Sequence, residues 1–419
     1  MADSNRAVII VDGYSAGNLL APEFRTRGFR TVHVQSTQEI WKVLLPTFRP
    51  EDYDQNFAFD GNLEELIAKL KPMNPIGVVP GTETGVELAD TLSAKLAIKS
   101  NGVKKSAARR NKYDMVEAVR SAGLRAAKQF KSGNAKEIVD WFKKEKLAKV
   151  VVKPLNSAGT DNVAVCTTTD QVERAVGAIV GKTNMLGLTN GEALIQEFLE
   201  GTEHFLNTVS LDGHHHFTEI WKYKKRSING HDCVYDRNEL LPSFGEEELA
   251  MQDYVVGVLN ALDVRYGPAH TEVMMGPNGP ALVEVGTRLD GLSVPAVNIA
   301  CVGYGPLDLT ADVYGNEPEY MRKSKSPYKL RKHAYTVYLT SYQQGEVLSI
   351  PGEDRIKNLR SFFQMRLRVK PGSPIKKTTD YFTAPGFFTL VHESKAALEE
   401  DYQFVRAMEE RGEVFTVKE

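Results

Sequence analysis

A short, continuous apolar run near its start is the feature that most constrains what this chain can fold into. Ala7–Val11 reads AVIIV, and a strand that is apolar on both faces needs a covering layer on each side. Comparable strands are predicted at residues 31–34 and 76–79, with a helix-like stretch after Asp12-Gly13 and an amphipathic helix over residues 81–96. This alternation predicts a doubly wound α/β domain over residues 1–105. Its first turn, from Gly13 to Gly17, lacks the G-x-G-x-x-G pattern of a dinucleotide site.

The remaining sequence predicts a mixture of strands and helices. Strands are predicted at residues 150–152, 163–166, 205–211 and 217–221, and a hairpin at residues 274–285. Asn134 is expected to cap one helix, and Asp170 with Glu173 resembles a capping box at the start of another. A helix over residues 246–262, β-rich segments at 334–340 and 387–391, and a final amphipathic helix follow.

Composition excludes several classes of protein. The 419 residues carry a net charge of −2, so no global positive field would hold nucleic acid or an anionic membrane. No stretch of about 18 apolar residues predicts a membrane span, and the start of the chain lacks the pattern of a secretory signal. Three scattered cysteines favour neither a disulfide framework nor a zinc site. We therefore expect a cytoplasmic protein that binds neither nucleic acid nor membrane.

A lysine at the end of an apolar strand is the first candidate for chemistry. Lys153 follows the strand at residues 150–152 and precedes a loop of small and polar residues that runs to Asn162. Such a loop can offer backbone N–H groups to phosphate oxygens, and the lysine adds a positive charge. A surface hairpin whose lysine reaches water explains the same pattern equally well.

Two glutamates on the predicted hairpin are the second candidate. Glu272 and Glu284 lie on strands joined by Pro277-Asn278-Gly279, and Arg288 comes just beyond. Antiparallel pairing would bring both carboxylates to one face, where they repel unless a cation lies between them. Mg²⁺ prefers such oxygen ligands together with nucleotide phosphates. The alternative is an edge hairpin with two glutamates that face solvent.

A polar connector between two apolar strands is the third candidate. It reads Gln196-Glu-Phe-Leu-Glu-Gly-Thr-Glu203. Such a connector could clamp a heterocycle, and Glu203 could hold ribose hydroxyls. Alone it is a loop like many others, but the three candidates in this order are far more specific than any one.

Together these features resemble the ATP-grasp superfamily, over nearly the whole chain. The resemblance implies an N-terminal α/β domain over residues 1–105, a connecting helix over 106–125, and a nucleotide-binding lid over 126–197. A β-rich catalytic core over 198–330 and a β-rich closing subdomain over 331–419 would complete the chain. The expected class is therefore α/β, with an α+β core.

The resemblance also assigns roles to individual residues. Those it implies for binding ATP are Lys112, Lys153, Ser157, Gly159, Thr160, Gln196, Glu197, Leu199 and Glu203. Those it implies for binding Mg²⁺, with Mn²⁺ as the alternative ion, are Glu272 and Glu284. Those it implies for catalysis are Arg288 and Lys153.

One position departs from the common pattern of the superfamily. Many ATP-grasp enzymes place an asparagine, a further metal ligand, two residues after the second glutamate, whereas this chain has Gly286. A small residue stands there in the L-amino-acid ligase branch, which includes dipeptide synthetases. His270-Thr-Glu272 also resembles that branch.

The activity that the resemblance implies is an ATP-dependent union of a small-molecule carboxylate with an amine, above all of two amino acids. The bond would form through an acyl phosphate, with release of ADP and phosphate. Two alternatives stay open: an ATP-grasp carboxylase or purine-pathway-type ligase with another acceptor, and a silent nucleotide-binding scaffold. The complete set of lysines and metal carboxylates argues against the scaffold. Family analogy alone points to a homodimer.

Overall fold

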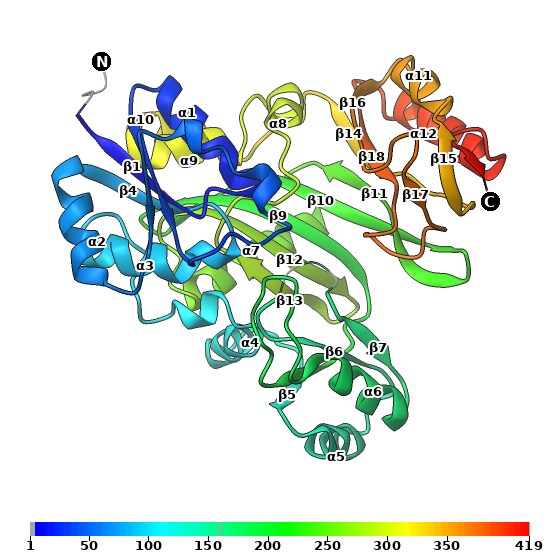
Figure 1. Ribbon diagram of the computed structural model, residues 1–419, viewed down its shortest axis with the longest axis horizontal. Helices are drawn as coiled ribbons and strands as arrows, with labels where there is room; N and C mark the ends of the chain where they lie inside the picture. Colours follow the sequence, from blue (N-terminus) through cyan, green and yellow to red (C-terminus); the bar gives the residue numbers. More distant parts are fainter. Residues whose placement is uncertain (1–4, 158, 160, 419) are drawn as a thin grey trace.

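The structure, a computed structural model, describes residues 5–157, 159 and 161–418. A long central sheet runs through it, with an N-terminal unit on one side and a C-terminal unit on the other (Figure 1). A smaller unit, residues 129–197, projects from this body. Within these described ranges, no helix combines the length and apolar character needed to cross a membrane.

The N-terminal unit is a four-stranded parallel sheet in the order β3-β2-β1-β4. Its elements are β1 (Ala7–Val11), α1 (Leu20–Thr26), β2 (Arg30–Gln35), β3 (Gln55–Ala58), α2 (Leu63–Leu70), β4 (Pro75–Pro80) and α3 (Val86–Lys95). Ile9 packs with α2 and α3, whereas Ile10 packs with α1. Both faces of the sheet are therefore covered, which confirms the predicted doubly wound domain. The sequence interpretation did not include β3 and α2.

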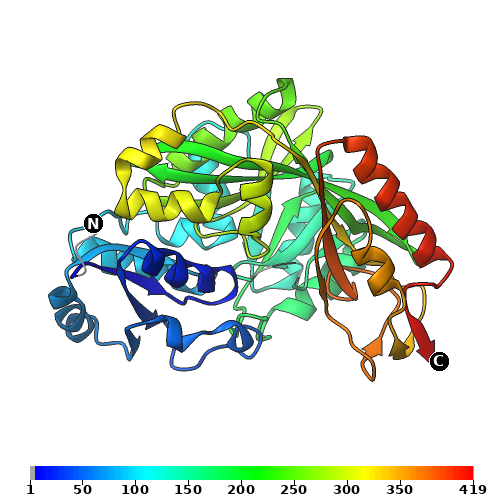
Figure 2. The same ribbon diagram turned by 90° about the horizontal axis from the view of Figure 1, so that it is seen from above.

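A helix from much later in the chain helps to cover one face of this sheet. Leu309 and Val313 of α9 (Pro306–Gly315) share a core with Ile10 of the N-terminal sheet and Val209 of the central sheet. Seen from above, the yellow helices of this region lie next to the blue N-terminal unit (Figure 2). The helix thereby fixes the N-terminal unit against the central sheet.

The smaller unit is an antiparallel sheet in the order β5-β8-β6-β7, with two helices packed on it. Its elements are β5 (Gln129–Ser132), α5 (Ala135–Glu145), β6 (Val150–Pro154), β7 (Ala164–Cys166), α6 (Thr169–Ile179) and β8 (Ala193–Glu197). Asn134 caps α5 as predicted. The capping box predicted at Asp170 and Glu173 is wrong, because Thr168 caps α6 and Gln171 completes the box. Only a residue still in extended backbone, as Thr168 is, can turn its side chain back onto the free N–H groups.

The central sheet has eight strands in the order β13-β12-β9-β10-β11-β14-β18-β16. Their bounds are β9 (Thr202–Leu211), β10 (His214–Ile228), β11 (His231–Leu241), β12 (Gly267–Gly276), β13 (Gly279–Gly286), β14 (His333–Tyr338), β16 (Phe362–Leu367) and β18 (Gly386–His392). The predicted hairpin turn between β9 and β10 is confirmed: Asp212 and Gly213 both have positive φ, at 50° and 81°. The chain crosses this sheet again in its C-terminal part, through β14, β16 and β18.

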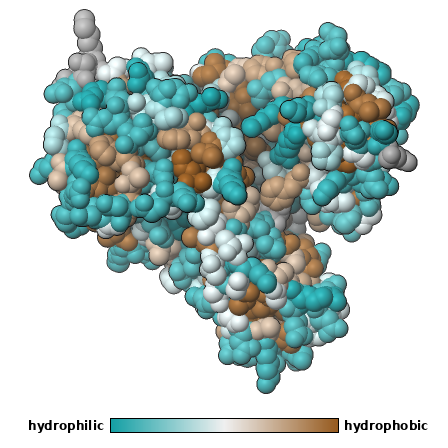
Figure 3. Space-filling view, in the orientation of Figure 1, coloured by the Kyte–Doolittle hydropathy of each residue, from teal (hydrophilic) through white to brown (hydrophobic). Residues whose placement is uncertain are grey.

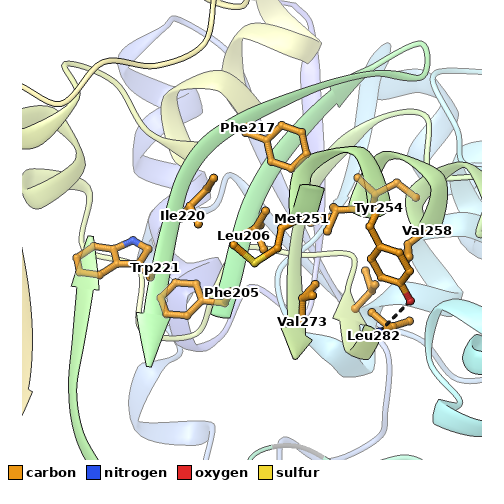
Figure 4. Packing of buried hydrophobic residues seen from close by; sticks show 14 of the residues in the cluster. Phe205, Leu206, Phe217, Ile220, Trp221, Met251, Tyr254, Val258, Val273 and Leu282 are labelled. Atoms are coloured by element: carbon orange, nitrogen blue, oxygen red, sulfur yellow. Dashed lines mark hydrogen bonds between the residues drawn. The ribbon is translucent and has the colours of Figure 1, made fainter. Parts of the chain in front are cut away.

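One face of the central sheet packs against helices, and the other keeps polar side chains. Met251 of α7 (Glu246–Ala261) lies against Leu206 and Val273, and the backbone N–H of Leu282 donates to the Tyr254 hydroxyl at 2.9 Å (Figure 4). α4 (Lys112–Ser121) joins the same core, and its side chain cap is Asn111. The polar face is therefore the one that is available to bind ligands.

The C-terminal unit adds a second, smaller sheet and a long helix. The remaining elements of the chain are α8 (Pro295–Cys301), α10 (Glu317–Lys323), β15 (Gly345–Ser349), α11 (Gly352–Lys357), β17 (Pro374–Ile375), α12 (Lys395–Glu410) and β19 (Thr416–Lys418). Arg406 of α12 is buried and reaches the carboxylates of Asp236 at 3.1 Å and Glu409 at 2.5 Å. This ion-paired cluster ties α12 to β11, and so to the central sheet.

Candidate active site

Strand register brings the two hairpin glutamates together on the polar face of the central sheet. Glu272 on β12 pairs directly with Glu284 on β13, as the hairpin pattern predicted. Alternation along β9 and β10 places Glu203, Phe205 and Glu219 on this same face. One sheet surface therefore carries several carboxylates side by side.

A lysine from outside the sheet satisfies one of these carboxylates. Lys112, the first residue of α4, places its Nζ 2.8 Å from Oε2 of Glu284 and also donates to the Ser157 carbonyl at 2.8 Å. Burial raises the pKa of Glu284, but Lys112 and Lys153 outweigh burial and lower this pKa to about 2. Glu284 is therefore ionised at neutral pH. Glu272 has weaker partners, the Tyr223 hydroxyl at 3.3 Å and the His270 ring at 3.5 Å.

Lys153, at the end of β6, is buried and has no ion-pair partner among the described residues. Only 6% of its surface is exposed. Burial and the nearby charge of Lys112 lower the pKa of Lys153 to about 8, although Glu284, Glu272 and Glu203 act in the opposite direction. None of these carboxylates lies within the 4.0 Å that defines an ion pair among the described residues. A buried ammonium without a carboxylate partner can bind a phosphate group.

The loop after Lys153 is fastened at both ends. The Ser157 hydroxyl donates to Asp161 at 2.6 Å, and Asp161 also accepts from the backbone N–H of Met185 at 3.0 Å. Gly159 has a φ of +63°, and Thr160, predicted to bind the nucleotide, lies outside the described residues.

The loop that supplies Met185 also touches the N-terminal unit. A Cβ on Gly187 would fall 1.7 Å from the ring of Trp41. The Trp41 ring therefore packs so close to Gly187 that any side chain there would clash, and this contact joins the N-terminal unit to the smaller unit.

The predicted adenine connector begins inside β8 rather than after it. The Gln196 side chain is buried and donates to Gln129 at 3.1 Å. The backbone N–H of Glu197 donates to the Lys128 carbonyl at 2.8 Å, so this N–H is not free for a base. Leu199 follows at the junction of the smaller unit with β9 and is half-buried. These residues lie together at that junction, while Glu203 lies on the sheet.

Glu203 has a lysine partner that was not predicted. Lys225 of β10 donates to Glu203 at 2.5 Å and lies 4.5 Å from the centre of the Tyr235 ring. Burial raises the pKa of Glu203, and Lys225 only partly offsets it. A side chain that competes for Lys225 would change this pair.

Arg288 is held by a glutamate from the N-terminal unit. Its guanidinium lies 2.8 Å from Oε1 of Glu83, and the second oxygen of Glu83 accepts from Arg110 at 2.5 Å. Burial opposes the charge of Arg288, but Glu83 and then Asp290 outweigh it and raise the pKa of Arg288.

The same pair explains why position 286 is glycine. A Cβ on Gly286 would fall 2.4 Å from Oε1 of Glu83 and 2.9 Å from the central carbon of the Arg288 guanidinium. An asparagine at this position would therefore displace the Glu83–Arg288 pair. The sequence interpretation missed Glu83 and Arg110, although polar residues directly after β4 occupy the carboxyl edge of a parallel sheet, where ligands commonly bind.

Two cavities open over this polar face. The first, which we call the ion-paired cavity, is lined by Glu83, Arg110, Lys112, Met115, Ser157, Glu284 and Val285. The second, which we call the amide-lined cavity, is lined by Phe205, Glu219, Trp221, Asn238, Asp290, Leu292, Ser293, Val294, Val297, Asn298 and Thr336. The space-filling view shows a hollow between the N-terminal and C-terminal units (Figure 3).

Comparison with known proteins gives a consistent result. Residues 147–296 match the family model of the ATP-grasp domain. Dapdiamide A synthase from Enterobacter agglomerans is 31% identical, over 97% of this chain and 96% of that enzyme. The fold is similar to that of an L-amino acid ligase from Bacillus licheniformis, with a TM-score of 0.75, 17% identity and 100% of both chains covered. It is also similar to phosphoribosylglycinamide synthetase from Anaerococcus prevotii, with a TM-score of 0.66, 15% identity, and 99% and 100% covered.

Proposed function

This chain belongs to the ATP-grasp family, and on that premise we propose that it is an ATP-dependent ligase that joins a small-molecule carboxylate to an amine. The observation that carries the proposal is the meeting of Lys112 and Glu284 at one cavity that is also lined by Glu83, the partner of Arg288. Lys153 is buried near Glu284 and has no ion pair among the described residues. Full-length similarity to an enzyme named as the synthase of an amide supports the same conclusion.

The residues of the ion-paired cavity fit a nucleotide with a divalent cation. Glu272 and Glu284 face each other with hard oxygen ligands, and Lys112 bonds to only one of them. Lys153 is a buried ammonium that lacks an ion pair among the described residues. We therefore assign ATP to Lys112, Lys153, the 157–162 loop and the connector at Gln196 to Glu203, and Mg²⁺ or Mn²⁺ to the two glutamates. When bound, the metal would neutralise charge on the phosphates.

The chain's own residues would then act in three ways. Lys112 and Lys153 neutralise phosphate charge while the carboxylate of the substrate is phosphorylated. Arg288, held in place by Glu83, stabilises the oxyanion that forms when the amine attacks the acyl carbon and phosphate leaves. The loop that begins at Ser157 excludes water, which protects the acyl phosphate from hydrolysis.

The finer parts of the proposal are the substrates and the setting. We propose amino acids as substrates, ADP and phosphate as products, the cytoplasm as the location and a homodimer as the assembly. A carboxylase or purine-pathway ligase shares the fold, as the phosphoribosylglycinamide synthetase likeness illustrates at 15% identity, but that likeness concerns the fold alone.

The test is a mass-spectrometric screen of amino-acid pairs incubated with the full-length protein, ATP and Mg²⁺. A condensed product with one equivalent each of ADP and phosphate is expected. AMP with pyrophosphate would refute the acyl-phosphate route. Turnover that depends on bicarbonate would support a carboxylase, and no nucleotide turnover with any pair would support a silent scaffold.

A further inference from the structure

The amide-lined cavity contains polar atoms that nothing in the described chain satisfies. The side-chain oxygens of Asn238 and Asn298 and the hydroxyl of Ser293 are buried and have no hydrogen-bond partner among the described residues. Asn238 and Asn298 each expose only 4% of their surface. A buried polar atom without a partner is costly, so atoms of this kind that line one cavity indicate a polar occupant.

The polar groups of this cavity are overwhelmingly acceptors. The amide oxygens of Asn238 and Asn298 are acceptors only, and Asp290 and Glu219 add two carboxylates. The carboxylate of Asp290 accepts a single hydrogen bond among the described residues, from the backbone N–H of Leu292 at 3.0 Å. An acceptor-rich wall favours a ligand group that donates several hydrogen bonds.

Arg288 acts on Asp290 from outside the cavity lining, and the described lining itself contains no cation. Neither lysine nor arginine occurs among the described residues that line the cavity. Glu219 is buried, and its described hydrogen-bond donors are all neutral side chains, those of Asn207, Trp221 and Asn298 at 2.6, 2.7 and 2.5 Å. The ligand group that fits this environment carries a positive charge.

The cavity is also connected to the carboxylates of the candidate metal site. Asn207, which donates to Glu219, has its own oxygen 2.8 Å from the His270 ring, and the other ring nitrogen of His270 lies 3.5 Å from Glu272. Asp290 follows Arg288 by two positions in the sequence. A ligand in this cavity is therefore next to the reacting groups, as a substrate must be.

We propose that the amide-lined cavity binds a primary ammonium group of an amino-acid substrate, with Asp290, Asn238, Asn298 and Ser293 as its hydrogen-bond acceptors. An ammonium has three N–H donors and no acceptor, and it matches this wall in both charge and hydrogen-bonding sense. Phe205 and Trp221, stacked at 5.9 Å, with Leu292 and Val297 supply an apolar boundary for the carbon skeleton. This inference rests on the proposed ligase function, because it takes the occupant to be a substrate.

The test measures binding rather than turnover. The full-length protein with Mg²⁺ and ADP is titrated calorimetrically with each standard L-amino acid, and every ligand that binds is compared with its N-acetyl derivative and its desamino acid. A charge-assisted hydrogen bond implies that the free ammonium binds about 10- to 100-fold more tightly than either derivative. Asp290→Asn keeps the acceptor for the Leu292 N–H and removes the charge. It should reduce this preference to within about threefold.

Two further variants separate a local effect from a loss of folding. Ser293→Ala removes one unpartnered hydroxyl and should weaken binding of the ammonium ligand by about two- to fivefold, without changing ADP affinity. Asp212→Asn changes an exposed acid at the β9–β10 turn, where its φ of 50° suits asparagine. This control should leave both affinities unchanged.

Several outcomes would overturn the assignment of the cavity. The first is that no amino acid binds. The second is that the parent protein binds the N-acetyl and desamino derivatives as tightly as the free amino acid. The third is that Asp290→Asn and Ser293→Ala both keep the full preference for the ammonium. The proposed ligase function fails separately, if amino acids bind with the expected preference and no pair is condensed in the mass-spectrometric screen. Condensation without a preference for the ammonium would retain the ligase and reject this cavity assignment.

Discussion

Two cavities lie over the same polar face of the central sheet, and they are built on opposite electrostatic principles. In the ion-paired cavity, Lys112 meets Glu284 at 2.8 Å and Arg110 meets Glu83 at 2.5 Å. In the amide-lined cavity, no lysine or arginine lines the wall beside Glu219 and Asp290 among the described residues, and the side-chain oxygen of Asn238 has no hydrogen-bond partner among them. The ion-paired cavity can bind a charged ligand if the ligand replaces one partner of an existing ion pair. The second needs a ligand that brings the missing donors.

The largest expected effect comes from the carboxylate pair at the ion-paired cavity. Glu284→Gln removes one formal charge with little change of volume, and Lys112 then lacks its counter-ion. Because metal-assisted stabilisation of transition-state charge is worth several kcal/mol, turnover should fall about 1,000-fold. The fall in turnover is measured as phosphate release at limiting Mg²⁺, and circular dichroism checks that the variant is folded. Glu173→Gln, at an exposed position on α6, is the matched control. Activity near that of the parent would show that Glu284 is not a metal ligand.

Arg288 gives the next largest effect and tests whether it acts on the reaction or only on the fold. Arg288→Lys keeps the charge but loses the planar fork that faces Glu83. Loss of an oxyanion donor costs about 100- to 1,000-fold in turnover, so both Arg288→Lys and Arg288→Ala should fall in that range with ATP affinity preserved. The exposed Arg265→Lys is the control. Turnover within a few-fold of the parent would contradict a catalytic role, and a loss confined to ATP affinity would make Arg288 a nucleotide ligand.

Lys153 allows a test in which stability and activity move in opposite directions. Burial lowers the pKa of Lys153 in the folded protein to about 8, below the 10.5 that is usual for a lysine. The unfolded chain therefore binds the proton more tightly, and the penalty on folding is complete below pH 8 and fades as the pH rises toward 10.5.

Lys153→Met should accordingly stabilise the nucleotide-free protein by about 3 kcal/mol at pH 7, while it lowers turnover. Denaturant unfolding of parent and variant at a series of pH values measures the difference, which should shrink steadily above pH 8. A difference that does not depend on pH would mean that packing, and not the buried charge, distinguishes the two proteins.

The smallest expected effect belongs to the amide-lined cavity. Trp221→Phe removes the indole N–H that donates to Glu219 at 2.7 Å but keeps an aromatic ring against Phe205. A lost hydrogen bond of about 0.5–1.5 kcal/mol predicts a two- to tenfold rise in the KM for the amino acid and no change in the KM for ATP. Trp141→Phe, in the smaller unit, is the control. Equal changes in both KM values would mean that the two cavities are not independent.

The local pattern of apolar residues was enough to predict several strands of the sheets. The strand at Ala7–Val11 and the opposition of Glu272 and Glu284 both follow from side-chain alternation and a short turn. β10 was predicted only at residues 217–221, whereas it runs over His214–Ile228. Its second half is polar, and Lys225 in that half forms an ion pair with Glu203. β11 was missed because its sequence is also largely polar.

Contacts between distant parts of the chain could not be predicted in this way. Glu83 comes from the N-terminal unit and pairs with Arg288, which follows strand β13 of the central sheet. The sequence around either residue does not predict that the two will be in contact. Gly286 illustrates the point: the sequence showed a departure from the usual asparagine, but only the structure shows that Glu83 occupies the space a side chain would need. The assignment of Gln196, Glu197, Leu199 and Glu203 to the nucleotide stays a prediction.

The contact between Trp41 and Gly187 gives the molecule a built-in optical reporter. The chain has three tryptophans, and each reports on a different place. Trp41 lies across the contact of the N-terminal and smaller units, Trp141 is stacked on Phe130 within the smaller unit, and Trp221 lines the amide-lined cavity. Separation of the two units would hydrate Trp41 and shift its emission to longer wavelength, while the emission of Trp141 would serve as an internal reference. Variants that each keep one tryptophan could therefore time the movement of the smaller unit and the filling of the cavity in one unlabelled protein.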